Sequence, residues 1–197
     1  MRNTKYWFFS LMMAVAFSSC QKDYVPKPYS YFRIDLPEKK YKDFSPENAP
    51  YQFELPVYSL VTPYSGNDSA RFWYNVVMPQ LSATIHISYV PLGEDNLRKL
   101  LDETYELAYK HQVKASSIDE ELIQKTEGRK YGIIYHIRGN AASPIQFFVT
   151  DSSSNFLRGA LYFDNRPNID SIAPVLDFVE KDVYHIIESL QWKNGLP

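Results

Sequence analysis

The sequence predicts an α+β fold, an antiparallel sheet with two main helices. Three observations support this prediction. Stretches in which apolar and polar residues alternate indicate strands, and two stretches with apolar residues at every third or fourth position indicate helices. The strand patterns come in runs that a helix interrupts, whereas a doubly wound sheet would alternate strand and helix strictly. Turn-forming residues separate the last three strand patterns, which is typical of an antiparallel meander.

The first two strands are predicted at residues 31–36 ("YFRIDL") and 51–55 ("YQFEL"), in a proline-rich part of the chain. Both segments alternate apolar and polar residues with the period of two that a half-buried strand requires. We expect the apolar side of the first strand to join the core through Phe32, Ile34 and Leu36.

A second pair of strands is predicted at residues 71–78 and 81–90. Pro79 ends the first of them, because proline cannot donate to a strand ladder. The other strand separates an apolar face from a polar face. The polar face comprises Ser82, Thr84, His86 and Ser88.

After Gly93 the period changes, and apolar residues at helical spacing predict an amphipathic helix of about fifteen residues. Asp95 or Asn96 is placed to cap its start. The stripe consists of Leu97, Leu100, Leu101, Thr104, Leu107, Ala108 and His111. Residues 113–125 ("VKASSIDEELIQK") are ambiguous, and we interpret them as a connection.

Three further strands are predicted at residues 131–139, 145–151 and 156–163. Each is rich in the β-branched and aromatic residues that favour strands. The gaps between them, "NAASP" and "SSSN", contain the residues that turns prefer.

A second helix is predicted to close the chain. Ser171 or Ala173 is expected to cap it, and Pro174 is tolerated in a first turn. The apolar stripe of this helix consists of Leu176, Val179, Val183, Ile186, Ile187 and Leu190.

The N-terminus has the pattern of a signal peptide, predicted at residues 1–19. Arg2 and Lys5 are followed by the uncharged run "YWFFSLMMAVAF" and then by two serines and Cys20. This run is too short to cross a hydrocarbon core, which needs about 20 helical residues. We therefore expect no membrane span.

Cys20, the only cysteine, is predicted to be the lipidation site. The "FSSC" sequence resembles the lipobox of bacterial lipoproteins, in which the cysteine is acylated and becomes the first mature residue. It departs from the usual pattern at Phe17, where Leu is common. The alternative is a buried or free thiol, but a lone cysteine in an exported protein would be a liability. Acyl chains on Cys20 would hold the chain to a membrane.

Residues 20–30 are interpreted as the lipidated cysteine and a tether, because Pro26 and Pro28 favour an extended path. Residues 31–197 are long enough for a single α+β domain. The net charge is −2 and no basic patch stands out, so nucleic acid is not an expected partner.

The sequence contains no glycine-rich phosphate loop, no G-x-S-x-G elbow and no H-E-x-x-H helix. One alternative is an envelope hydrolase or metal-dependent enzyme, in which His86 and His136 converge with a carboxylate such as Asp151 if their strands are neighbours. The simpler interpretation is a polar sheet face. Glu120 and Glu121 are interpreted as a solvated face. We therefore predict no catalytic residue, no metal ligand and no cofactor.

The order of the predicted elements resembles the Mog1/PsbP-like architecture. In that architecture, helices pack on the faces of an antiparallel sheet. The predicted order here is two strand pairs, a helix, a three-strand meander and a terminal helix. The resemblance concerns the fold and implies no activity.

Several segments resemble the gliding motility lipoprotein GldD family of Bacteroidetes, in the same order from Cys20 onward. They are "YVPKPYSYFRIDLPEKKY", "YQFELPVYS", "WYNVVMPQLSATIHISYVPL" and "LAYKHQVKAS". The resemblance implies a non-catalytic, lipid-anchored accessory of the gliding motility and type IX secretion machinery, whose partners are other envelope proteins. Gln21 after the cysteine favours an outer-membrane location facing the periplasm over retention in the inner membrane.

The side of the first predicted strand that faces away from the core is a possible partner-binding site, made by Tyr31, Arg33 and Asp35. Tyr and Arg are enriched at binding hot spots, and a plain strand does not require them. The alternative is an internal ion pair between Arg33 and an acidic residue.

Overall fold

The computed structural model describes residues 34–66, 71–93, 96–164 and 169–193. These residues belong to one compact unit, Ile34–Pro197. The predicted signal peptide, Cys20 and the tether lie outside the described residues. Nothing in the described part of the chain qualifies as a membrane-spanning helix, by length and apolar character together.

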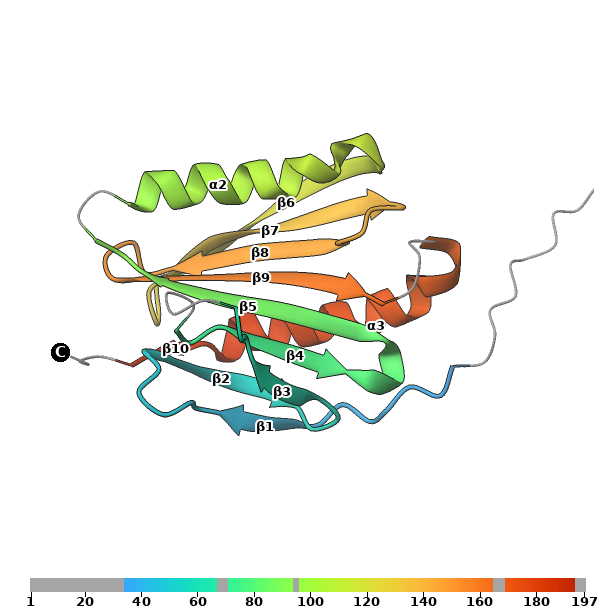
Figure 1. Cartoon of the computed structure of the whole chain (residues 1–197), viewed down its shortest axis with the longest axis horizontal. Coiled ribbons are helices and arrows are strands. Elements are labelled where there is room, and N and C mark those ends of the chain that lie inside the picture. Colours follow the sequence, from blue (N-terminus) through green and yellow to red (C-terminus); the bar gives the residue numbers. More distant parts are fainter. Residues whose placement is uncertain (1–33, 67–70, 94–95, 165–168, 194–197) are drawn as a thin grey trace, which may run out of the picture. The chain divides into compact units, whose positions relative to one another are not determined.

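A seven-stranded antiparallel sheet forms the centre of the unit (Figure 1), in the order β3-β4-β5-β9-β8-β7-β6. Its strands are β3 (Leu60–Pro63), β4 (Tyr74–Met78), β5 (Ala83–Pro91), β6 (Ala115–Lys125), β7 (Lys130–Gly139), β8 (Ile145–Thr150) and β9 (Asn155–Phe163). A smaller antiparallel sheet has the order β1-β2-β10. It consists of β1 (Tyr41–Phe44), β2 (Tyr51–Pro56) and β10 (Gln191–Trp192).

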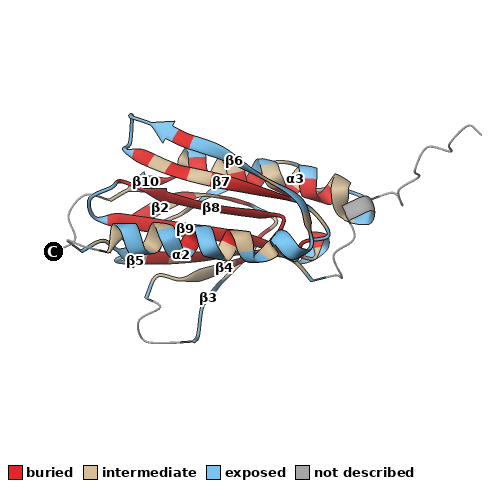
Figure 2. Cartoon of the chain, turned by 90° about the horizontal axis from the view of Figure 1, so that it is seen from above, coloured by how far each residue is buried: buried red, intermediate tan, exposed pale blue. Residues whose placement is uncertain are grey.

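Two helices pack on the large sheet, one on each face. Helix α3 (Ile169–Ser189) shares the main core with β2, β4 and β5. Helix α2 (Leu97–Tyr109) shares a second, smaller core with β7 and β8 on the opposite face. Figure 2 shows that β8, between these two cores, is buried along its length. The predicted α+β fold with two main helices is therefore confirmed.

The register of the large sheet fixes which side chains share a face. Directly opposed residues on antiparallel strands point to the same side, and successive residues alternate. One row across the sheet lies on the α2 side, and the adjacent row lies on the α3 side. The α2 row is Asn75, His86, Ala160, Gln146, Tyr135 and Glu120; the α3 row is Val76, Ile85, Leu161, Ile145, His136 and Asp119.

The predicted strand at residues 31–36 is wrong in its described part. Ile34 and Leu36 lie in no strand, and they are 36% and 41% exposed. The alternating pattern predicted a core side for this segment, but the first strand begins only at Tyr41. Alternation over so few residues did not distinguish a strand from an exposed extended segment.

The connection expected at residues 113–125 is also wrong, because most of it forms β6. This strand lies at the edge of the sheet and pairs only with β7. Most of its side chains are exposed, so it needs no alternation of apolar and polar residues. The pairing, which no local pattern encodes, is what makes it a strand.

The closing helix begins earlier than predicted. It starts at Ile169, so neither Ser171 nor Ala173 is its cap, and Pro174 lies inside the helix. Proline at this position removes one backbone hydrogen bond near the start of the helix. The predicted apolar stripe is confirmed, since every residue in it from Leu176 to Leu190 is buried.

Candidate functional site

The two histidines of the alternative enzyme site do not converge. Strands β5 and β7 are separated by β9 and β8. His86 lies in the row that faces α2, whereas His136 lies in the adjacent row that faces α3. The sheet therefore stands between the two imidazoles.

Asp151 has a local structural role at the turn between β8 and β9. Its Oδ1 accepts hydrogen bonds from the backbone N–H groups of Ser153, Ser154 and Asn155, at 2.8 to 3.0 Å. Burial raises the pKa of this carboxyl, but the hydrogen bonds to Asp151 outweigh that effect and the pKa is lowered. Asp151 thus organises the turn and supplies no carboxylate to either histidine.

His136 instead joins β6, β7 and α3. Its Nε2 lies 3.1 Å from Glu121 Oε2, and its Nδ1 lies 3.0 Å from Glu180 Oε1. The second contact has the distance of an ion pair but lacks hydrogen-bond geometry. Tyr184 on α3 donates to Glu121, and this hydrogen bond lowers the pKa of the Glu121 carboxyl. Glu121 is therefore not simply part of a solvated face, as predicted, but links the edge strand to the helix.

Asp182, at the centre of a polar cluster on α3, is completely buried. Its Oδ1 accepts from Lys39 Nζ at 2.5 Å and from the Tyr41 hydroxyl at 3.0 Å, and its Oδ2 accepts from the Tyr58 hydroxyl at 2.5 Å. We call Lys39, Tyr41, Tyr58 and Asp182 the Asp182 cluster. It ties the chain segment that precedes β1 to the middle of α3.

Lys39 has further partners on the helix. Its Nζ donates to the carbonyl oxygen of Phe178 at 2.8 Å and lies 3.5 Å from the centroid of the Phe178 ring. Burial lowers the pKa of the Lys39 ammonium, and the hydrogen bond and charge of Asp182 oppose this effect. A carboxylate and an ammonium are costly to bury without partners, and here the Asp182 carboxylate has three donors.

The sequence did contain a signal for this cluster. Asp182 lies three residues after Val179 and four before Ile186, at helical spacing within the predicted apolar stripe. A carboxylate on a buried stripe requires buried donors. Their identity could not be predicted, because Lys39 and Tyr58 are distant from Asp182 in sequence.

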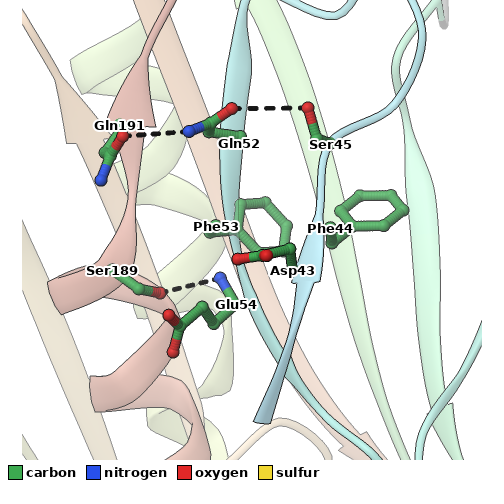
Figure 3. Close-up of a pocket in the computed structure, with 8 residues that line it drawn as sticks. All are labelled: Asp43, Phe44, Ser45, Gln52, Phe53, Glu54, Ser189 and Gln191. Carbon is green, nitrogen blue, oxygen red and sulfur yellow. Dashed lines mark hydrogen bonds between the residues drawn. The ribbon is translucent and has the colours of Figure 1, made fainter.

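A groove of about 310 Å³ lies beside this cluster, between β1, β2 and the end of α3 (Figure 3). Asp43 and Glu54 are directly opposed on β1 and β2 and line the groove. Glu54 Oε2 lies 2.6 Å from His185 Nε2, and the His185 ring stacks on Tyr41 at 3.5 Å between centroids. His185 therefore has structural contacts of its own.

Amides, hydroxyls and the rings of Phe44 and Phe53 line the rest of this groove. Figure 3 shows Gln52 between Gln191 and Ser45, with hydrogen bonds to both. Ser189 Oγ accepts a hydrogen bond from the backbone N–H of Glu54. The groove is polar and acidic, and its side chains bind one another. No group of His, Cys, Asp and Glu suited to a metal ion occurs in the described ranges.

Of the predicted partner-binding residues, Tyr31 and Arg33 lie outside the described residues, as does Cys20. Asp35 is described and exposed. The predicted site is thus described at only one of its three positions.

The sheet with a helix on each face places the described unit in the PsbP-like class of α+β proteins. The chain is similar to the solution structure of cyanobacterial PsbP (CyanoP) from Synechocystis sp. PCC 6803, with a TM-score of 0.51 and 11% sequence identity. The match covers 80% of this chain and 95% of that chain. At this identity the likeness concerns the fold alone.

The family follows from the sequence. The family model of the gliding motility lipoprotein GldD matches residues 21–192. The chain belongs to the GldD lipoprotein family, as the resemblance of its segments predicted. A search of curated proteins gave no match.

Proposed function

We propose that this chain is a non-catalytic, lipid-anchored accessory protein that helps assemble or stabilise the Bacteroidetes gliding motility and type IX secretion machinery. The observation that carries the proposal is the GldD family match, which begins at residue 21, directly after Cys20. The expected location of the protein is the outer membrane, facing the periplasm. The expected partners are envelope proteins of the same machinery.

The polar clusters support a non-catalytic role. Asp182, His136 and Asp151 are each occupied in joining elements of the fold. The hydrolase alternative required His86 and His136 on one surface, and the sheet separates them. This geometry favours an interaction protein over an enzyme.

The test of this function is an in-frame deletion in a gliding host. We expect secretion of type IX cargo and colony spreading to be lost, and the unaltered chain to restore both. Cross-linking followed by affinity capture and mass spectrometry of the envelope should then recover components of that machinery. Normal secretion and spreading in the deletion strain would overturn the proposal.

Cys20→Ala tests the anchor. Because acyl chains supply the membrane affinity, this change is expected to move the protein from the membrane fraction to the soluble fraction, or to leave an uncleaved precursor. Fractionation and radioactive palmitate labelling measure the result. Ser19→Ala is the matched control and should leave labelling intact. Continued palmitate labelling of Cys20→Ala would show that the lipid is attached elsewhere.

Tyr31, Arg33 and Asp35 are proposed as a partner contact. The exposure of Ile34 and Leu36 supports this, because a segment that served only to hold the fold together would bury its apolar side chains.

The double change Tyr31→Ala and Arg33→Ala is expected to leave the melting temperature within about 2 °C, since residues that serve a partner contact add little to the stability of the free protein. Secretion and spreading should be lost, because Tyr and Arg carry binding energy at interfaces. Lys40→Ala, at an exposed position in the same part of the chain, is the control. A parallel loss of stability and activity would mean that the segment has only a structural role.

A further inference from the structure

The α2 side of the large sheet is only partly covered. Helix α2 packs over β7 and β8, and Figure 2 shows β3 and β4 extending beyond it. On this open part lies a second groove of about 310 Å³, lined by residues of β4, β5 and β9 and by Tyr64 and Trp73. We call it the β5–β9 groove. It lies on the opposite face of the sheet from α3 and the Asp182 cluster.

Arg158 of β9 lines this groove and has an incompletely paired charge. Its Nη2 donates to Gln146 Oε1 at 2.9 Å, but Nε is buried and has no acceptor among the described residues. The described residues also give Arg158 no ion pair. Burial lowers the pKa of its guanidinium, since the cation is poorly solvated. A half-buried cation in this state is stabilised by an oxyanion, which guanidinium binds through two hydrogen bonds.

The neighbouring histidine presents an acceptor. His86 Nδ1 lies 2.7 Å from Asn75 Oδ1, and because this oxygen can only accept, Nδ1 carries the proton. Desolvation lowers the pKa of His86 and the charge of Asp164 opposes this effect, so the neutral ring, whose Nε2 is an acceptor, is favoured. An oxyanion cannot donate to that nitrogen, whereas a hydroxyl group can. The groove thus suits a ligand with both an anionic group and hydroxyls.

Aromatic rings form the walls of the groove. The rings of Tyr64 and Trp73 lie 5.6 Å apart between centroids, and Tyr162 packs edge-on against His86 at 5.4 Å. Trp73 Nε1 donates to the carbonyl oxygen of Tyr89 at 2.7 Å, which fixes its ring. Such rings offer flat apolar surfaces to the C–H face of a ring-shaped ligand. The volume is at the lower end of the roughly 300–1,000 Å³ of small-molecule sites.

We propose that the β5–β9 groove binds an acidic sugar, a pyranose ring that carries a carboxylate or a phosphate. Arg158 binds the oxyanion, His86 and Asn75 bind ring hydroxyls, and Tyr64 and Trp73 contact the face of the ring. This inference is independent of the proposed role in motility and secretion.

The test is a titration of the full-length protein, purified in detergent, followed by calorimetry or by tryptophan fluorescence. The probes are glucuronic acid, glucose 6-phosphate, glucose, acetate and inorganic phosphate. We expect glucuronic acid, glucose 6-phosphate or both to bind at least about tenfold more tightly than glucose, acetate and phosphate, as expected for one charge-assisted hydrogen-bonded pair. The first two probes distinguish a carboxylate from a phosphate as the anionic group.

Variants assign the binding to this groove. Arg158→Gln is expected to weaken the binding of the acidic sugar about tenfold or more. Arg98→Gln, the same change on the exposed side of α2, should not affect this binding. Tyr64→Ala, at an exposed position, tests the aromatic wall without disturbing the core. The inference would be overturned if neither acidic sugar bound, or if glucose, acetate or phosphate bound as tightly as the acidic sugars. It would also be overturned if Arg158→Gln and Tyr64→Ala both left the affinity for the acidic sugar unchanged.

Discussion

Replacing Asp182 with alanine is expected to lower the free energy of unfolding by about 3–5 kcal/mol, the range found when one partner of a buried ion pair is removed. The change leaves Lys39 and the hydroxyls of Tyr41 and Tyr58 without their common acceptor. Urea denaturation followed by tryptophan fluorescence measures the effect.

Two further variants separate the contributions within the Asp182 cluster. Tyr41→Phe removes one of three donors and should cost about 1 kcal/mol. Lys39→Met keeps the aliphatic length over Phe178, and it should cost less than Asp182→Ala because two phenols still donate to the carboxylate. A loss below about 1 kcal/mol for Asp182→Ala would contradict the assignment of this carboxylate as the buried link between the chain before β1 and α3.

Val183→Asp is expected to be the second severely destabilising change. Val183 is 1% exposed and belongs to the main core between α3 and the sheets. An aspartate there would place a charge in the apolar core without a positioned hydrogen-bond donor. Burying it would cost several kcal/mol or displace the helix. Thermal unfolding followed by circular dichroism measures the loss.

The control for this change is Lys181→Asp, which introduces the same residue at an exposed position of α3. His185 is a poor control, although it lies off the stripe, because Asp at this position would lose the stacking on Tyr41 and face Glu54. Equal destabilisation by Val183→Asp and Lys181→Asp would mean that the buried face of α3 is assigned wrongly.

Local sequence patterns predicted the elements that bury one face and expose the other. Strand β2 and the stripe of α3 each bury one face, so their periods of two and 3.6 are visible in the sequence. The strand β6 was missed because an edge strand is exposed on most positions. Conversely, Ile34 and Leu36 showed the alternation of a strand but are exposed.

The contacts between polar residues were beyond local prediction for a different reason. His136 was identified as a candidate from its residue type, but its partners depend on which strands are neighbours and on the position of α3 over the sheet. The strand order β5-β9-β8-β7 places two strands between the histidines that the sequence suggested could meet. Topology thus determined the site chemistry, and the periodic patterns carry no information about topology.

The Asp182 cluster also determines how mechanical load would enter the folded unit. Tension on an anchor at Cys20 would travel along the backbone to Lys39, whose side chain is bound to α3. Without that bond, the load would reach β1 directly and peel this short edge strand from β2, one backbone hydrogen bond at a time. With it, the load passes into α3 through the ion pair of Lys39 with Asp182, and the hydroxyl of Tyr41, at the start of β1, holds the same carboxylate. If tension were applied through a lipid anchor, the contact with α3 would resist unfolding before the edge strand β1 did.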